Sequence, residues 1–244
     1  MRKYSYGSIL LILIVNSIIV GFLQNIFDGN LSILGGFVAF IFDYIICRGL
    51  LYNREGSFSD YFRGIKTMTG KVFLMNILVG AITVILVLLA TLLSGAGSLV
   101  FYDFAIAIDS NMVVISLIVL YVLVMIFTSL IFAYMNFFMA DERYRDLTFF
   151  DSFMLIIRAG FKLFNESFMA GLRSYKISLI LGAIALLAGI LSIKTPSIVL
   201  IAIILGVIAA IAFFLLTPRF RASLADIYEE NNERIYSNKV EEDL

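Results

Sequence analysis

Long apolar stretches recur along the chain and are separated by short polar segments. A helix needs about 20 mostly apolar residues to cross the roughly 30 Å hydrocarbon core of a bilayer. Six stretches approach or exceed this length, and they cover residues 8–27, 31–51, 72–93, 112–140, 177–193 and 197–217. The pattern predicts an all-α polytopic membrane protein. Its six transmembrane helices form a single membrane domain over residues 1–217, which a polar cytoplasmic tail over residues 218–244 follows.

The segments between these stretches refine the prediction. Segment 94–111 is too polar and too interrupted by glycine to cross a bilayer, so we expect it on the outer surface. The 112–140 stretch would be about 43 Å long at 1.5 Å per residue, so it should tilt or extend past the inner interface. The first stretch is longer than the apolar region of a signal peptide, and no small-residue cleavage site follows it before Asp28. It is therefore expected to remain as the first span.

Charge is distributed very unevenly between the two sides of this topology. Of the 18 Lys and Arg residues, 17 fall on one side, and Lys194 falls on the other side together with Asp28, Asp103 and Asp109. Cytoplasmic loops carry the excess of positive residues. The asymmetry predicts that both termini are cytoplasmic and that the protein is a multi-pass protein of the cytoplasmic membrane. The composition agrees, since 61% of the chain is hydrophobic and 15% is charged.

A short pattern of Ser or Thr, then an apolar residue, any residue, Asp, any residue and an aromatic follows each helix that exits to the inner side. It occurs at residues 57–62, 148–153 and 223–228. A Ser or Thr at an N-cap accepts a bond from a free backbone N–H, and an acid three residues later can reach back to the cap. Each copy therefore predicts the start of a cytoplasmic helix.

The helices that the first two copies predict are amphipathic. Aromatic and aliphatic residues recur at three- and four-residue steps, while cations occupy the flanks and the other faces. Such a helix can lie in the headgroup region of the bilayer, so lipid headgroup contacts are possible at Arg63, Lys66, Arg158 and Lys162. The alternative is that these helices are capped connectors that pack on the inner ends of the bundle.

Asp43 is the one carboxylate well inside a predicted span, which makes it a candidate functional acid. A structural role is the alternative, either through an interhelical hydrogen bond or through a pair near the interface, where Arg48 is long enough to snorkel. Asn76, Thr83 and Asn136 are expected to form interhelical hydrogen bonds. Small residues at Ala185 and Gly189, and again at 202, 206 and 210, predict close packing of the last two spans.

The sequence contains no recognisable catalytic constellation. The chain has no His and a single Cys, Cys47, so the usual general base and a Cys-rich metal site are lacking. No phosphate-binding loop, metal-ligand spacing or compact basic domain for nucleic acid is present. We therefore expect a protein that is not an enzyme, with no cofactor, metal or nucleic-acid partner, and with the lipid bilayer as its main partner.

Six helices, the amphipathic inner segment before the fifth, and the exit at Pro218 into an Ala/Asp/Tyr tail ending at Tyr228 resemble a known pattern. Over residues 35–230 the chain resembles six-helix bacterial integral membrane proteins of a domain-of-unknown-function family. These are similar to the membrane domain fused to some glycerophosphodiester phosphodiesterases. The resemblance implies the architecture; because no phosphodiesterase domain is present, it implies no catalytic residues.

Two functional hypotheses follow. The first is an accessory, scaffold or envelope-associated membrane domain that binds a protein partner through its cytoplasmic helices or tail. The alternative is a transporter or permease component for a small solute or lipid, which would require a polar cavity within the membrane near Asp43.

Overall fold

The computed structural model describes residues 2–26, 32–102, 110–192 and 195–242. Within these ranges the chain is helical and contains no strand. Six helices are long and apolar enough to cross a membrane. The prediction of an all-α polytopic protein is therefore confirmed. The predicted outer charges Asp28, Asp103, Asp109 and Lys194 lie outside the described residues.

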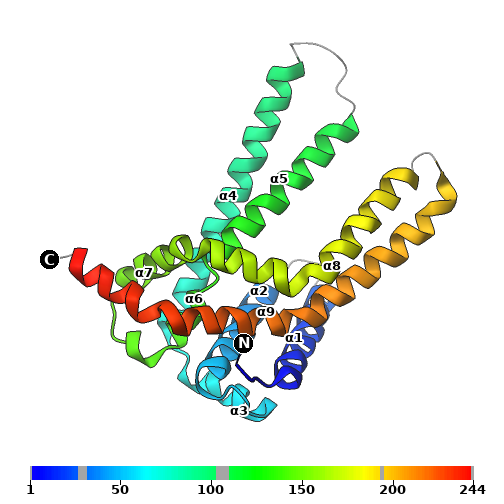
Figure 1. Ribbon diagram of the computed structural model, residues 1–244. Coiled ribbons are helices and arrows are strands. Elements are labelled where there is room, and N and C mark those ends of the chain that lie inside the picture. Colours follow the sequence, from blue (N-terminus) through cyan, green and yellow to red (C-terminus); the bar gives the residue numbers. More distant parts are fainter. Residues whose placement is uncertain (1, 27–31, 103–109, 193–194, 243–244) are drawn as a thin grey trace.

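Three hairpins carry the spans. The first pairs α1 (Tyr6–Ile26) with α2 (Ser32–Tyr52), the second α4 (Gly70–Tyr102) with α5 (Ser110–Ile131), and the third α8 (Phe164–Ser192) with α9 (Val199–Glu242). The α4/α5 and α8/α9 hairpins diverge from a common base (Figure 1). Their outer parts expose apolar side chains, such as Leu92 and Leu186, as expected for lipid-facing helices.

Short elements gather at the base of the hairpins and form what we call the platform. It comprises α3 (Phe58–Phe62), the 3-10 helix η1 (Arg63–Thr67), α6 (Met135–Ala140), η2 (Glu142–Tyr144), α7 (Phe149–Lys162) and the C-terminal half of α9. The third hairpin also contains η3 (Pro196–Ile198). The largest buried cluster lies here, with Tyr61, Tyr134, Phe137, Phe138 and Tyr228 all at 1% exposure or less.

The two capping predictions at the platform are confirmed. Ser57 caps α3: its hydroxyl accepts from the backbone N–H of Asp60 at 3.4 Å, and the Asp60 carboxylate accepts from the Ser57 N–H at 2.9 Å. The Ser57 hydroxyl also donates to the Asp60 carboxylate at 2.7 Å, and this bond, together with the one from the Ser57 N–H, holds the pKa of Asp60 below its usual value. Thr148 caps α7, and its hydroxyl accepts from the Asp151 N–H at 3.1 Å.

The third copy does not begin a helix, and this prediction is wrong. Ser223 lies inside α9 and its hydroxyl donates to the Arg219 carbonyl at 3.0 Å. The helix passes through Pro218 because neighbouring groups can satisfy the backbone in a membrane helix; the Tyr6 hydroxyl donates to the Leu215 carbonyl at 2.9 Å in that turn. The predicted polar tail is consequently the packed second half of α9.

Three other predicted boundaries also shift. The helix predicted to end at residue 93 continues to Tyr102, so part of segment 94–111 is helical, while residues 103–109 lie outside the described residues. The long 112–140 stretch ends as α5 at Ile131 and resumes as α6 after a turn at 132–134. The amphipathic inner segment divides at the buried Leu163, and its second part continues as α8 directly into the fifth span.

The last two spans pack together as predicted. The Ser178 hydroxyl of α8 donates to the Ala209 carbonyl of α9 at 2.7 Å, and both residues are buried. The contact does not follow the predicted small-residue register on α9, since Ala210 is exposed and a side chain added at Gly206 would meet nothing within 4 Å.

Candidate functional site

An ion pair at Asp43 joins α2 to α9, two helices that lie far apart in the sequence. The Arg221 guanidinium of α9 lies 2.5 Å from the Asp43 carboxylate of α2. Both side chains are mostly buried yet keep about a quarter of their surface accessible, 24% for Asp43 and 27% for Arg221. Asp43 therefore sits in a pair, and its partner comes from the segment that had been predicted to be a polar tail.

Two asparagines complete the environment of the acid. Asn136 of α6 donates its amide to the second Asp43 oxygen at 2.6 Å, and Asn76 of α4 donates to the Asn136 side-chain oxygen at 3.2 Å. Asn76 also donates to the Val72 carbonyl of its own helix at 2.9 Å. The predicted interhelical role of Asn76 and Asn136 is confirmed. Asn76 thus holds the amide that donates to Asp43.

A cavity of about 640 Å³ opens beside the pair, between the bases of the α4/α5 and α8/α9 hairpins. Its lining includes Asp43 and Arg221, apolar residues such as Phe168 and Phe220, and the hydroxyl-bearing residues Thr83, Thr128, Ser129, Tyr175 and Thr217. Thr83 and Thr128 donate to carbonyls within their own helices, at 2.8 and 2.7 Å. Thr83 thus faces the cavity and does not make the interhelical bond that the sequence predicted.

Arg48 does not pair with Asp43, in contrast to the partner that the sequence suggested. Its guanidinium donates to the Ala140 carbonyl at 2.8 Å and to the Glu142 carboxylate at 2.6 Å, and it stacks over the Tyr52 ring at 4.7 Å. The side chain thus extends toward the platform and away from the span. The hollow beside it measures about 30 Å³, enough for little more than a water molecule.

A second polar cluster surrounds Asp141, whose side chain is 1% exposed. The carboxylate accepts from the Tyr52 hydroxyl at 3.2 Å, from the Tyr228 hydroxyl at 2.8 Å, and from the Arg143 guanidinium at 2.8 Å. Burial alone would raise the pKa of Asp141, but the bonds from Arg143 and Tyr228 outweigh it and the pKa lies below its usual value. The cluster ties α2, η2 and α9 together and faces no sizeable cavity.

The start of the chain is also bound to α9. Arg54 pairs with Asp226 and lies 3.7 Å from Glu229, while Arg2 pairs with Glu229 and donates its backbone N–H to Asp226 at 3.3 Å. The Asp of the third motif copy therefore serves as an ion-pair partner for the loop after α2. These contacts, like those of Asp141, are structural.

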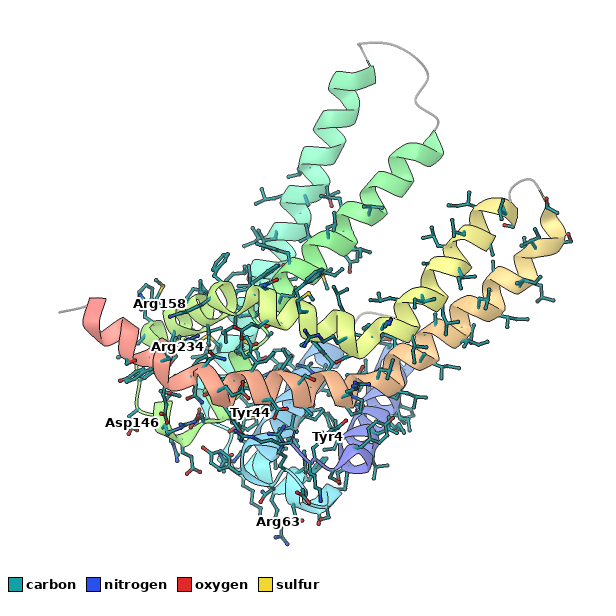
Figure 2. All side chains as sticks on the ribbon, viewed as in Figure 1. Tyr4, Tyr44, Arg63, Asp146, Arg158 and Arg234 are labelled. Atoms are coloured by element: carbon teal, nitrogen blue, oxygen red, sulfur yellow. The ribbon has the colours of Figure 1, made fainter. Side chains whose placement is uncertain are left out.

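The four cations predicted to contact lipid headgroups lie in different surroundings. Arg63 is 75% exposed, points away from the bundle, and lies 3.5 Å from Asp60 (Figure 2). Lys66 and Lys162 are exposed, whereas Arg158 is half-buried on α7. Several aromatic residues of α7 and the start of α8 pack on the bundle: Phe153 stacks on Phe132, and Phe164 lies against Phe127. The connector interpretation therefore accounts for part of this segment, while Phe150 of α7 remains 69% exposed.

The described residues hold no group of three or more His, Cys, Asp or Glu side chains placed to bind a metal. Cys47 of α2 is buried within the largest core cluster. No family model, curated protein or solved structure matches the chain. The resemblance to six-helix bacterial membrane proteins therefore stays a prediction.

Proposed function

We propose that this membrane protein is a non-catalytic binding or transport component whose cavity takes an amphiphilic molecule. The observation that carries the proposal is the 640 Å³ cavity with the Asp43–Arg221 pair in its wall. Its volume falls within the roughly 300–1,000 Å³ of small-molecule sites. Charged groups within a span are costly and usually mark a ligand or ion path. The alternative hypothesis required a polar cavity near Asp43. The cavity beside Asp43 is mostly apolar with one charged pair in its wall, which favours an amphiphile over a small polar solute.

The apolar part of the ligand would lie between the hairpins and its polar part against the ion pair. The cavity is bordered by α4 and α5 on one side and by α8 and α9 on the other, and these helices expose apolar side chains toward the bilayer. A molecule with an alkyl portion would therefore match the lining along most of its length. Its polar group would replace water beside Asp43 and Arg221.

Filling the cavity should remove the bound molecule. Gly171 of α8 lines the cavity, and a Cβ there would make ordinary contact with Phe220 at 3.5 Å, so Gly171→Phe would project a ring into the space without a backbone clash. We expect wild type to retain a bound amphiphile through detergent exchange, measured by native mass spectrometry, and Gly171→Phe to lose most of it. The matched control is Gly189→Phe on the same helix, where nothing lies within 4 Å. Equal retention by all three proteins would contradict the proposal.

We also propose that the platform faces the cytoplasm of a cell whose cytoplasmic membrane holds the protein. The support is the positive-inside pattern, since the platform gathers cations such as Lys66, Arg143 and Lys162. Reporter fusions after Lys66 and Glu142 should give a cytoplasmic signal, and fusions near Gly29 and Asp103 an external one. A clear cytoplasmic signal from Asp103 would overturn this orientation.

An accessory role through a protein partner is the second candidate. The observation that favours it is the continuation of α9 to Glu242 across the platform, where Glu230 and Arg234 are exposed. A partner could bind this helix while the cavity holds its ligand, because the two surfaces lie at different parts of α9. Co-purification in mild detergent, repeated with Glu230 and Arg234 both replaced by Ala, would test it.

A further inference from the structure

The charge balance of the cavity specifies the polar group that it can accept. Asp43 and Arg221 are the charged residues of the described lining, and they neutralise one another at 2.5 Å. We propose that the cavity binds a zwitterionic head group, with its anionic group at Arg221 and its protonated amine at Asp43. This inference rests on the proposed function that the cavity holds an amphiphile.

A ligand with one charge would leave the other member of the pair without a counter-ion. An anion bound at Arg221 in place of Asp43 would leave the carboxylate with the neutral Asn136 amide, which donates at 2.6 Å but supplies no charge. A cation at Asp43 would likewise leave Arg221 uncompensated. An unpaired charge that is mostly buried is strongly unfavourable. A zwitterion satisfies both side chains at once. Asp43 exchanges the Arg221 cation for the ligand's amine, and Arg221 exchanges the Asp43 carboxylate for the ligand's anionic group.

The site geometry makes both side chains reachable from the cavity. Each keeps about a quarter of its surface accessible, and both belong to the lining. Asn136 of α6 donates to Asp43 and is itself held by Asn76 of α4, so the carboxylate keeps this bond when Arg221 turns toward a ligand. Arg221 suits an anionic oxygen pair because its guanidinium donates two parallel hydrogen bonds.

Hydroxyl groups next to the pair provide further acceptors and a donor. Thr217 lies one helical turn before Arg221 on α9, hence on the same face, and donates to the Phe213 carbonyl at 3.0 Å. The Tyr175 hydroxyl donates to Thr217 Oγ1 at 3.3 Å, a long bond that a ligand oxygen can replace. Both residues line the same cavity as the pair, where they can bind the linkage between a lipid head group and its chains.

The experiment compares head groups on the purified full-length protein. Delipidated protein in detergent is titrated with phosphatidylethanolamine, phosphatidylglycerol or a cationic lipid with matched chains, and binding is measured by native mass spectrometry and thermal stabilisation. Wild type should prefer the ethanolamine lipid by about tenfold, which corresponds to 1.4 kcal/mol. A parallel titration with glycerophosphoethanolamine tests whether the soluble head group is itself the ligand. Preference for either zwitterionic source supports the inference, and the two titrations tell the lipid and the soluble head group apart.

Charge variants make the same test sharper. Asp43→Asn gives the site one positive charge and should shift the preference to phosphatidylglycerol, whereas Arg221→Gln should shift it to the cationic lipid. The double variant should show little preference. Binding by wild type without head-group preference, or an unchanged preference in folded Asp43→Asn, would overturn this inference while leaving a lipid-binding cavity in place. If wild type bound none of these lipids, the proposed function would be overturned instead. The wild-type comparison decides the question even where a variant does not fold.

Discussion

Replacing Gly160 by alanine is expected to remove most of the folded protein. A Cβ at this position of α7 would lie 1.9 Å from the Ile131 carbonyl oxygen and 2.6 Å from its carbonyl carbon, at the end of α5. Both contacts are with backbone, so no side chain can move aside. The cost should reach or exceed the upper end of the roughly 1–3 kcal/mol typical of overpacking. The yield of monodisperse protein and its melting temperature in detergent measure the effect.

Gly80→Ala on α4 is the matched control for this substitution. Gly80 is exposed, and a Cβ there would meet nothing within 4 Å. Alanine is favoured over glycine in a helix by up to about 1 kcal/mol, so this variant should be neutral or slightly more stable. The same substitution would thus lower the stability at Gly160 and leave it unchanged or raise it at Gly80. A normal melting temperature for Gly160→Ala would show that α7 does not rest on the end of α5.

The lengths of the apolar stretches in the sequence were enough to find the spans, because the thickness of the bilayer sets the length of a transmembrane helix. The ends of the helices were predicted less well, since they depend on packing. Pro218 indicated a helix end by its missing N–H, yet α9 continues through it while Tyr6 donates to the Leu215 carbonyl nearby. The break after Ile131 has no Gly or Pro to mark it. It lets Tyr134 reach Ser167 at 2.6 Å and turns Phe137 and Phe138 into the core.

The sequence predicted only one of the two charged residues of the candidate site. Asp43 stood out because an acid in an apolar span is rare, and Asn136 and Asn76 were recognised from their own spans as groups for interhelical hydrogen bonds. Arg221 was missed because it had been assigned to a solvated tail. A helix carried through Pro218 would have kept Arg221 on the same face as Thr217, four residues earlier. That continuation was the signal available in the sequence, but Asp43 is 178 residues away, and only the fold brings the two side chains together.

Replacing Asp141 by asparagine should destabilise the platform more than any other conservative change of a polar side chain described above. The carboxylate accepts from Tyr52, from Tyr228 and from Arg143, and an amide can accept at one atom alone. Tyr228 is 1% exposed, so its hydroxyl would lose its partner within the core. An unsatisfied buried group costs about 1–3 kcal/mol, whereas Arg143 is 48% exposed and can be hydrated. Thermal unfolding in detergent at pH 7 should show the loss.

The same cluster predicts how stability depends on pH. Since the folded-state pKa of Asp141 lies below its usual value, mainly because the bonds from Arg143 and Tyr228 outweigh burial, ionised Asp141 stabilises the folded protein. Its contribution is complete above the unfolded pKa of about 3.9 and is lost as the pH falls through the folded pKa. Wild type should therefore lose stability below about pH 4 more steeply than Asp141→Asn. Asp146→Asn, at an exposed position five residues away, should keep the wild-type melting temperature at pH 7 and most of the wild-type slope in acid. If Asp141→Asn and Asp146→Asn behaved alike at both pH values, Asp141 would not hold α2 and α9 together.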